Sequence, residues 1–99
     1  MKREKLTEPQ IDAEMASLSV FGGWRLENGL LVKEFRFASY LDGVRFATRV
    51  AEAAESMDHH PDLTIFWRRV LFSVTTHSAS GLTELDFELA RRAEDQISR

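Results

Sequence analysis

The sequence predicts an α+β fold in which a four-stranded antiparallel sheet packs in two layers, with helices on one face. Apolar residues recur at helical spacing in three segments, and β-branched and aromatic residues concentrate in four shorter ones. These segments follow one another in the order α-β-β-α-β-β-α. Because an antiparallel sheet can bury one face under helices, two layers are the economical packing. The chain has the length of one domain, so residues 1–99 are expected to form a single domain.

The first helix is expected to begin after Thr7. Thr7 can cap the helix, Pro9 suits its first turn, and Gln10 stands where the partner of a capping box belongs. The apolar residues at helical spacing are Ile11, Met15 and Leu18. Gly22-Gly23 ends this pattern.

A β-hairpin is predicted around Asn28-Gly29, the sharpest turn signal in the chain. A type I′ turn needs positive φ at both central residues, which Asn-Gly tolerates. The flanking strands are then 24–27 and 30–37, with Leu26 opposite Leu31. The residues expected on the core face are Trp24, Leu26, Leu31, Phe35 and Phe37.

A long helix is predicted over residues 40–58. Ser39 is the expected N-cap, with Asp42 completing a capping box. Pro61 disfavours helical backbone at His60, so the helix should end near residue 58 or 59. Its apolar stripe comprises Val44, Phe46, Ala47, Val50, Ala51, Ala54 and Met57.

Two further strands and a final helix complete the chain. The strands are expected at 63–67 and 70–76, followed by a loop at 78–81. Phe66 and Trp67 are assigned to the core because they lie in the predicted strand 63–67. Thr83 caps the last helix with Asp86 as its partner. The apolar stripe of that helix is Leu85, Leu89, Ala93 and Ile97.

Composition excludes several classes of function. A formal net charge of −3 argues against direct nucleic-acid binding, which normally needs a basic face. Uncharged stretches are shorter than the ~20 apolar residues that span a bilayer, and no apolar segment follows the charged N-terminus as in a secretory signal. The absence of cysteine excludes disulfides, thiolate metal sites and a cysteine nucleophile. A small cytoplasmic enzyme or interaction module is expected.

The chemistry-bearing candidates are the three histidines, His59, His60 and His77. Histidine is the side chain whose unperturbed pKa lies nearest neutral pH, so such a group suits acid–base catalysis. Ordinary surface or core histidines remain an open alternative. A metal site is disfavoured because adjacent side chains in extended backbone point apart. The chain also lacks the glycine-rich phosphate loops and the GxSxG elbow of nucleotide-binding proteins and serine hydrolases.

Carboxylates accompany these histidines. Glu55 lies one helical turn before the pair, where it can share a face with them, and Asp58 directly precedes them. Asp86 has an independent structural explanation as the capping partner of Thr83, although a residue at a helix start can also face a ligand.

The spacing of these residues resembles the pterin-4a-carbinolamine dehydratase family. The matching string is Glu55-x3-His59-His60-Pro61, then Trp67 after five residues, His77 after nine more and Asp86 after eight more. The resemblance extends over nearly the whole chain. Three positions depart from the family pattern, with Leu63 in place of a common tryptophan, Trp67 in place of the usual tyrosine, and Ser80 in place of a residue that is often glycine.

The resemblance implies a hydro-lyase of tetrahydrobiopterin recycling. It would eliminate water from 4a-hydroxytetrahydrobiopterin to give quinonoid dihydropterin, without a metal or organic cofactor. On this chain it implies His59 and His77 as the acid–base pair and His60 mainly as a substrate holder. The residues implied in substrate binding are Glu55, Asp58, Pro61, Thr76 and Asp86.

The resemblance also implies a homodimer or homotetramer. Two alternatives stay open beside the enzyme. One is a dehydratase-like module that binds a protein partner, in the manner of a cofactor for transcription-factor dimerisation. The other is a pterin protein of molybdenum cofactor metabolism.

Overall fold

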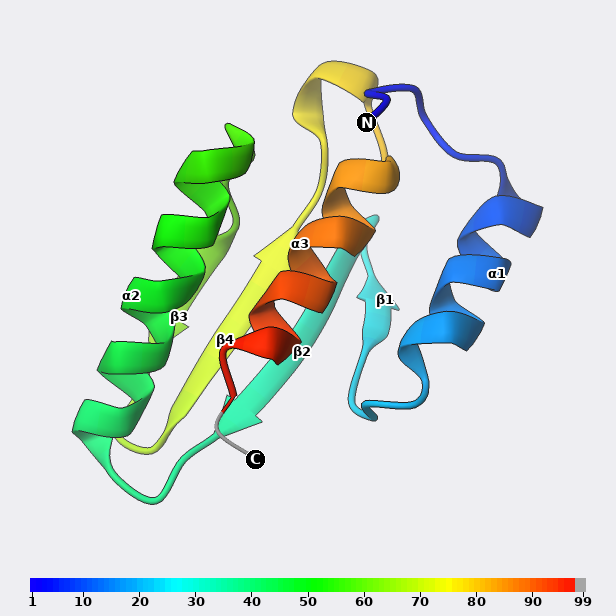
Figure 1. Ribbon diagram of the computed structural model, residues 1–99. Coiled ribbons are helices and arrows are strands. Elements are labelled where there is room, and N and C mark those ends of the chain that lie inside the picture. The colour runs from blue at the N-terminus through cyan, green and yellow to red at the C-terminus, as the bar shows by residue number, and fades with distance from the viewer. Residues whose placement is uncertain (98–99) are drawn as a thin grey trace.

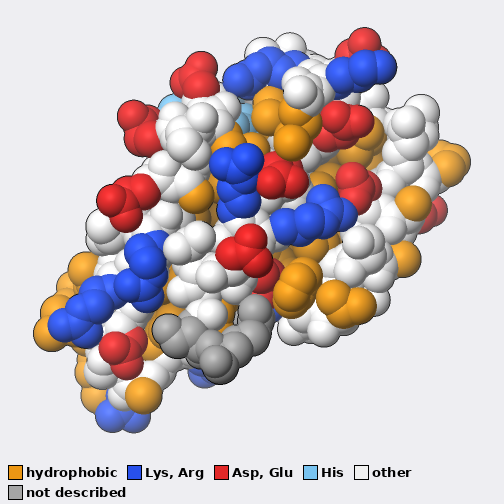
Figure 2. Space-filling view, in the orientation of Figure 1, with side chains coloured by type: hydrophobic (Ala, Val, Ile, Leu, Met, Phe, Trp, Pro, Cys, Tyr) orange, Lys and Arg blue, Asp and Glu red, His pale blue; other side chains and the backbone are white. Residues whose placement is uncertain are grey.

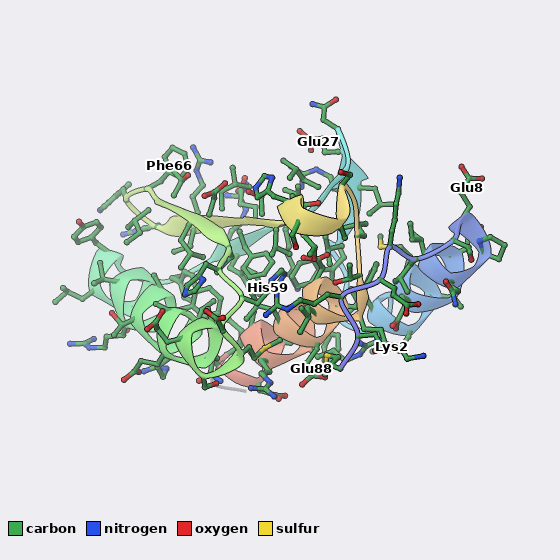
Figure 3. All side chains as sticks on the ribbon, turned by 90° about the horizontal axis from the view of Figure 1, so that it is seen from above. Lys2, Glu8, Glu27, His59, Phe66 and Glu88 are labelled. Atoms are coloured by element: carbon green, nitrogen blue, oxygen red, sulfur yellow. The ribbon has the colours of Figure 1, made fainter. Side chains whose placement is uncertain are left out.

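The computed structural model describes residues 1–97 and arranges them in two layers (Figure 1). The elements are α1 (Glu8–Leu18), β1 (Arg25–Glu27), β2 (Leu30–Arg36), α2 (Tyr40–Met57), β3 (Asp62–Ile65), β4 (Arg69–Val74), a 3₁₀ turn η1 (His77–Ala79) and α3 (Glu84–Asp95). The strands form one antiparallel sheet in the order β1-β2-β4-β3. The helices gather on one side of it (Figure 3). The predicted α+β class and element order are confirmed.

The first hairpin forms around the predicted turn. Asn28 and Gly29 have φ angles of 51° and 77°, and Leu26 pairs with Leu31 as expected. Leu26 is nevertheless 45% exposed, so its assignment to the core was wrong. β1 is a three-residue strand at the sheet edge, beyond the area that α2 and α3 cover. Trp24 precedes that strand and is half-buried against the core.

Helix α2 begins and ends close to its predicted limits. Ser39 Oγ accepts a hydrogen bond from the backbone N–H of Asp42, 3.2 Å away. The predicted capping box is only half formed, because the carboxylate of Asp42 faces Arg45 at 3.5 Å. The helix ends where Asp58 adopts left-handed backbone, with φ of 50°. The residues that the helix buries are Gly43, Phe46, Ala47, Val50 and Ala54, whereas the predicted core residue Ala51 is exposed.

The second hairpin is shifted from its predicted position. β3 ends at Ile65, and the Phe66 N–H closes the turn on Arg69 O at 2.8 Å. Phe66 and Trp67 are therefore 37% and 70% exposed, and their assignment to the core was wrong. Both lie beyond Ile65, the last paired residue of β3. Arg68 lies over the Trp67 ring at 4.3 Å.

The core lies between the sheet and the helices, and it includes one ion pair. Glu94 of α3 is fully buried and pairs with the ammonium group of Lys33 on β2. Trp24 Nε1 donates to the same carboxylate oxygen of Glu94 at 2.8 Å. The apolar residues that form this core are Leu18, Leu31, Phe35, Phe46, Val50, Ala54, Val70, Phe72, Val74, Leu82, Phe87, Leu89, Ala90 and Ala93.

Capping boxes begin α1 and α3, as predicted. In α1 the pair is Thr7 and Gln10, and in α3 it is Thr83 and Asp86. The predicted loop at 78–81 contains most of the 3₁₀ turn η1. Within the described part of the chain, none of the helices has the length and apolar character needed to cross a membrane.

Candidate functional site

Three segments that are distant in sequence meet at one end of the sheet. They are the end of α2, which leads into His59 and His60, the residues after β4, and the start of α3. The left-handed residue Asp58 turns the chain out of α2, and the His59 N–H then bonds to Ala54 O at 3.1 Å. This reversal directs the His59 ring between the helices and the sheet, as Figure 3 shows.

His59 is held by a completely buried carboxylate. Its Nε2 lies 2.6 Å from Asp86 Oδ1, and only 6% of the residue is exposed. The other carboxylate oxygen, Oδ2, accepts from the Thr83 N–H and from Thr76 Oγ1, each at 2.8 Å. Asp86 therefore performs both tasks considered for it, because it caps α3 and binds a histidine.

The donor and the acceptor of each hydrogen bond around Asp86 can be assigned. The Thr76 hydroxyl donates to Asp86, so the bond of 2.8 Å between Thr76 and Thr83 must take its proton from Thr83. Thr83 Oγ1 in turn accepts from the Leu85 N–H at 3.3 Å. An ionised carboxylate only accepts, so His59 presents Nε2–H to Asp86 and keeps Nδ1 as its second functional atom. The network thus determines both the orientation and the tautomer of His59.

His60 faces the opposite way and is solvent-exposed. Its Nε2 lies 2.5 Å from Glu55 Oε1, so Glu55 lies beside His60, whereas the buried His59 bonds to Asp86. Both side chains are more than half exposed, so the pair is accessible to solvent and to a ligand. Pro61 follows and is half-buried.

A shallow pocket of about 220 Å³ brings the three histidines together. The residues that line it are Arg3, Asp58, His59, His60, Thr75, Thr76, His77 and Ser78. His77 is the first residue of η1 and is exposed. Of the residues expected in substrate binding, Asp58 and Thr76 line the pocket directly. Glu55 and Asp86 reach it through His60 and His59.

Some residues of this region were not expected from sequence. Thr83 is fully buried and orients both Thr76 and Asp86, and its capping-box position was the available signal. Arg3 and Ser78 line the pocket without any motif that marks them. Arg3 comes from the N-terminal segment, whose path only the tertiary structure defines.

The arrangement suits proton transfer. It places one oriented, nearly buried imidazole beside two exposed ones in an open pocket, and imidazoles can donate and accept protons near neutral pH. Mixed acidic and basic side chains surround this region on the helix-covered face (Figure 2). Among residues 1–97, no group of three histidine, aspartate or glutamate side chains has an arrangement that could hold a metal ion.

The chain matches one known family over almost its whole length. The model of the family described as pterin 4 alpha carbinolamine dehydratase matches residues 4–96. The chain belongs to this family. Its members include a relative from Mycobacterium sp. (strain JLS), 44% identical over 95% of this chain and 97% of the relative. Another is from Metallosphaera sedula, 42% identical over 92% of both chains, and both bear the pterin-4-alpha-carbinolamine dehydratase name.

Solved structures show the same fold. A Brucella melitensis protein described as a transcriptional coactivator/pterin dehydratase superposes with a TM-score of 0.88 at 29% identity, covering 96% of this chain and all of that one. A pterin dehydratase-like protein, described as a RuBisCO assembly factor of the alpha-carboxysome, gives a TM-score of 0.65. It is 22% identical and covers 76% of this chain and 89% of its own, so it supports the fold alone.

Proposed function

We propose that this chain is an active pterin-4a-carbinolamine dehydratase of tetrahydrobiopterin recycling. The substrate is 4a-hydroxytetrahydrobiopterin. Its ring nitrogen loses a proton as the C=N bond forms, and the C4a–O bond breaks as the hydroxyl group takes up a proton and leaves as water. The reaction consumes one proton and releases one, so a pair of imidazoles can serve both ends.

One observation supports this proposal above the others. A buried carboxylate, Asp86, holds His59 in a single tautomer at the wall of a pocket that also contains His60 and His77. A histidine with a purely structural role does not need to face an open pocket. We assign His59 and His77 to proton transfer and His60, oriented by Glu55, to holding the substrate.

The remaining residues shape and support the site. Asp58 faces the pocket and can accept hydrogen bonds from the substrate. Thr76 contributes to the wall, and Pro61 sets the direction of the chain after His60. Asp86 acts through His59, which makes it a positioning residue.

The test is the formation of quinonoid dihydropterin from 4a-hydroxytetrahydropterin generated in the assay. Wild-type protein should accelerate the reaction, and His77→Ala should lower kcat by about 100-fold or more, the usual size of an acid–base contribution. Asp12→Ala is the control, since it removes an ionisable group from an exposed position on α1 that does not line this pocket. No acceleration by folded wild-type protein would contradict the proposal.

Protein binding is a second candidate function, favoured by the exposed turn after β3. Ile65, Phe66 and Trp67 are exposed there beside an edge strand, and Arg68 covers one face of the indole. Tryptophan and arginine often dominate binding energy at protein interfaces, and edge strands favour association. We propose that this surface supports a homodimer or homotetramer. Sedimentation of Trp67→Ala should then show weaker association at unchanged specific activity.

A further inference from the structure

The first seven residues form an N-terminal arm that lies against the start of α3. The backbone N–H of Lys2 donates to Glu84 Oε2 at 3.2 Å, and the Leu6 N–H donates to Leu82 O at 2.8 Å. Figure 3 shows the arm passing the first turns of α3, with Lys2 beside that helix. Lys5 packs so closely on Gly81 that a Cβ there would lie 2.7 Å from Lys5 Cε. The arm is therefore held at both ends of its path.

This path brings Arg3 to the rim of the histidine pocket. Arg3 Nη2 donates to the backbone oxygen of Asp58 at 3.1 Å, and both residues line the pocket. A guanidinium group carries five N–H donors, so one bond to a carbonyl leaves several available. Within residues 1–97, Arg3 forms no salt bridge. A residue with a cationic donor and a residue with a carboxylate thus line the same pocket, joined through the backbone oxygen of Asp58.

The pyrimidinone edge of a pterin has the complementary pattern. The 4-oxo oxygen accepts hydrogen bonds, whereas N3–H and the 2-amino group donate them. A carboxylate can accept from the two donors while an adjacent guanidinium donates to the oxygen. A pocket of about 220 Å³ is smaller than the ~300–1,000 Å³ of drug-sized ligand sites, which suits a compact bicyclic ring.

We propose that Arg3 and Asp58 together recognise the 2-amino-4-oxo edge of the pterin, with Arg3 donating to the 4-oxo oxygen. This inference rests on the proposed function, since it names the residues that select the ring which the histidines process. Arg3 is a specificity-determining residue contributed by the N-terminal arm. A site that pairs with a substrate group discriminates strongly against analogues in which that group is changed.

The experiment compares two ligands that differ at this edge. The first is 6-methylpterin, and the second is 2,4-diamino-6-methylpteridine, in which an amino donor replaces the 4-oxo acceptor and N3 loses its proton. Binding is measured by pteridine fluorescence at pH 7.5 for wild type, Arg3→Ala, Arg3→Lys and Lys2→Ala. Lys2→Ala is the matched control, because it removes a cationic side chain from the same arm but retains the backbone N–H that bonds to Glu84.

Wild-type protein should prefer 6-methylpterin. Arg3→Ala should weaken 6-methylpterin binding by about tenfold, the effect of one hydrogen bond from a charged donor, while diaminopteridine binding changes less than twofold. Arg3→Lys should restore part of the preference, because it keeps the charge and loses the planar fork. In turnover, Arg3→Ala should raise KM more than it lowers kcat. Lys2→Ala should match wild type.

Two results would overturn the inference. An equal loss for both ligands in Arg3→Ala would show that Arg3 only supports the backbone at Asp58, and wild-type affinity for both ligands would show that it does not contact the ring. If wild type turns over the carbinolamine in either case, the proposed function stands and only this inference fails. If wild type neither binds 6-methylpterin nor turns over the carbinolamine, the proposed function fails as well.

Discussion

Replacing Asp86 with asparagine should lower turnover while leaving the fold nearly intact. The asparagine side chain has the same shape, and its carbonyl oxygen can still accept from the Thr83 N–H and from Thr76 Oγ1. Its NH₂ group would then take the place of Asp86 Oδ1, which lies 2.6 Å from His59 Nε2. Because an amide nitrogen only donates, His59 would have to move its proton from Nε2 to Nδ1. The pocket would then meet the wrong tautomer.

The size of the effect follows from the bond that is lost. A hydrogen bond to a charged group contributes about 1.5–3 kcal/mol, which corresponds to a loss of roughly 10- to 100-fold in kcat. Asp86→Ala should behave differently, because it leaves three buried donors without their acceptor and removes half of the capping box of α3. Each such donor costs about 1–3 kcal/mol, so the alanine variant should melt at least ~10 °C below wild type.

Three measurements test this reasoning. The first is kcat for quinonoid dihydropterin formation, and the second is thermal unfolding of wild type and both variants. The third is the ¹⁵N NMR signature of the His59 ring, which should show Nε2–H in wild type and Nδ1–H in Asp86→Asn. An asparagine variant with wild-type kcat, or with the wild-type tautomer and a lowered kcat, would refute the argument.

Two further changes test other parts of the structure. Glu55→Gln removes a carboxylate from an exposed pair with His60, and exposed pairs contribute only about 0–1 kcal/mol, so thermal stability should hardly change while KM for the carbinolamine rises. A KM equal to that of wild type would remove Glu55 from substrate binding. Lys33→Met takes the ammonium group away from the buried carboxylate of Glu94, and breaking such a pair costs about 3–5 kcal/mol. The urea concentration at the midpoint of unfolding should fall accordingly. An unchanged midpoint would show that this pair does not stabilise the fold.

Sequence patterns predicted helix starts and turns well, because these features depend on residues that are close together in the chain. The capping boxes at Thr7 and Thr83 depend on residues three apart, and the turn at Asn28-Gly29 depends on backbone preferences of two residues. The same signals failed for Leu26 and Trp67. Both are of residue types common in protein cores, yet Leu26 lies on the short edge strand β1 and Trp67 in the turn after β3, and both are exposed.

The candidate site also has features that the sequence predicts and features that it does not. The spacing from Glu55 to Asp86 indicated the three histidines and the family, and the pairing of Glu55 with His60 follows from one turn of helix. The bond between His59 and Asp86 could not be predicted in this way, because 27 residues separate them and the packing of α2 against α3 brings them together.

The sequence by itself determined the order of the elements, the main turns and caps, and the identity of the residues able to exchange protons. These properties depend on residue type and on spacing within a few residues. Tertiary structure alone decided which nitrogen of His59 bonds to Asp86, that Asp86 serves this histidine while completing the capping box of α3, and that the N-terminal arm carries Arg3 to the rim. Burial and hydrogen-bond geometry arise between segments that are distant along the chain, and no local pattern encodes them.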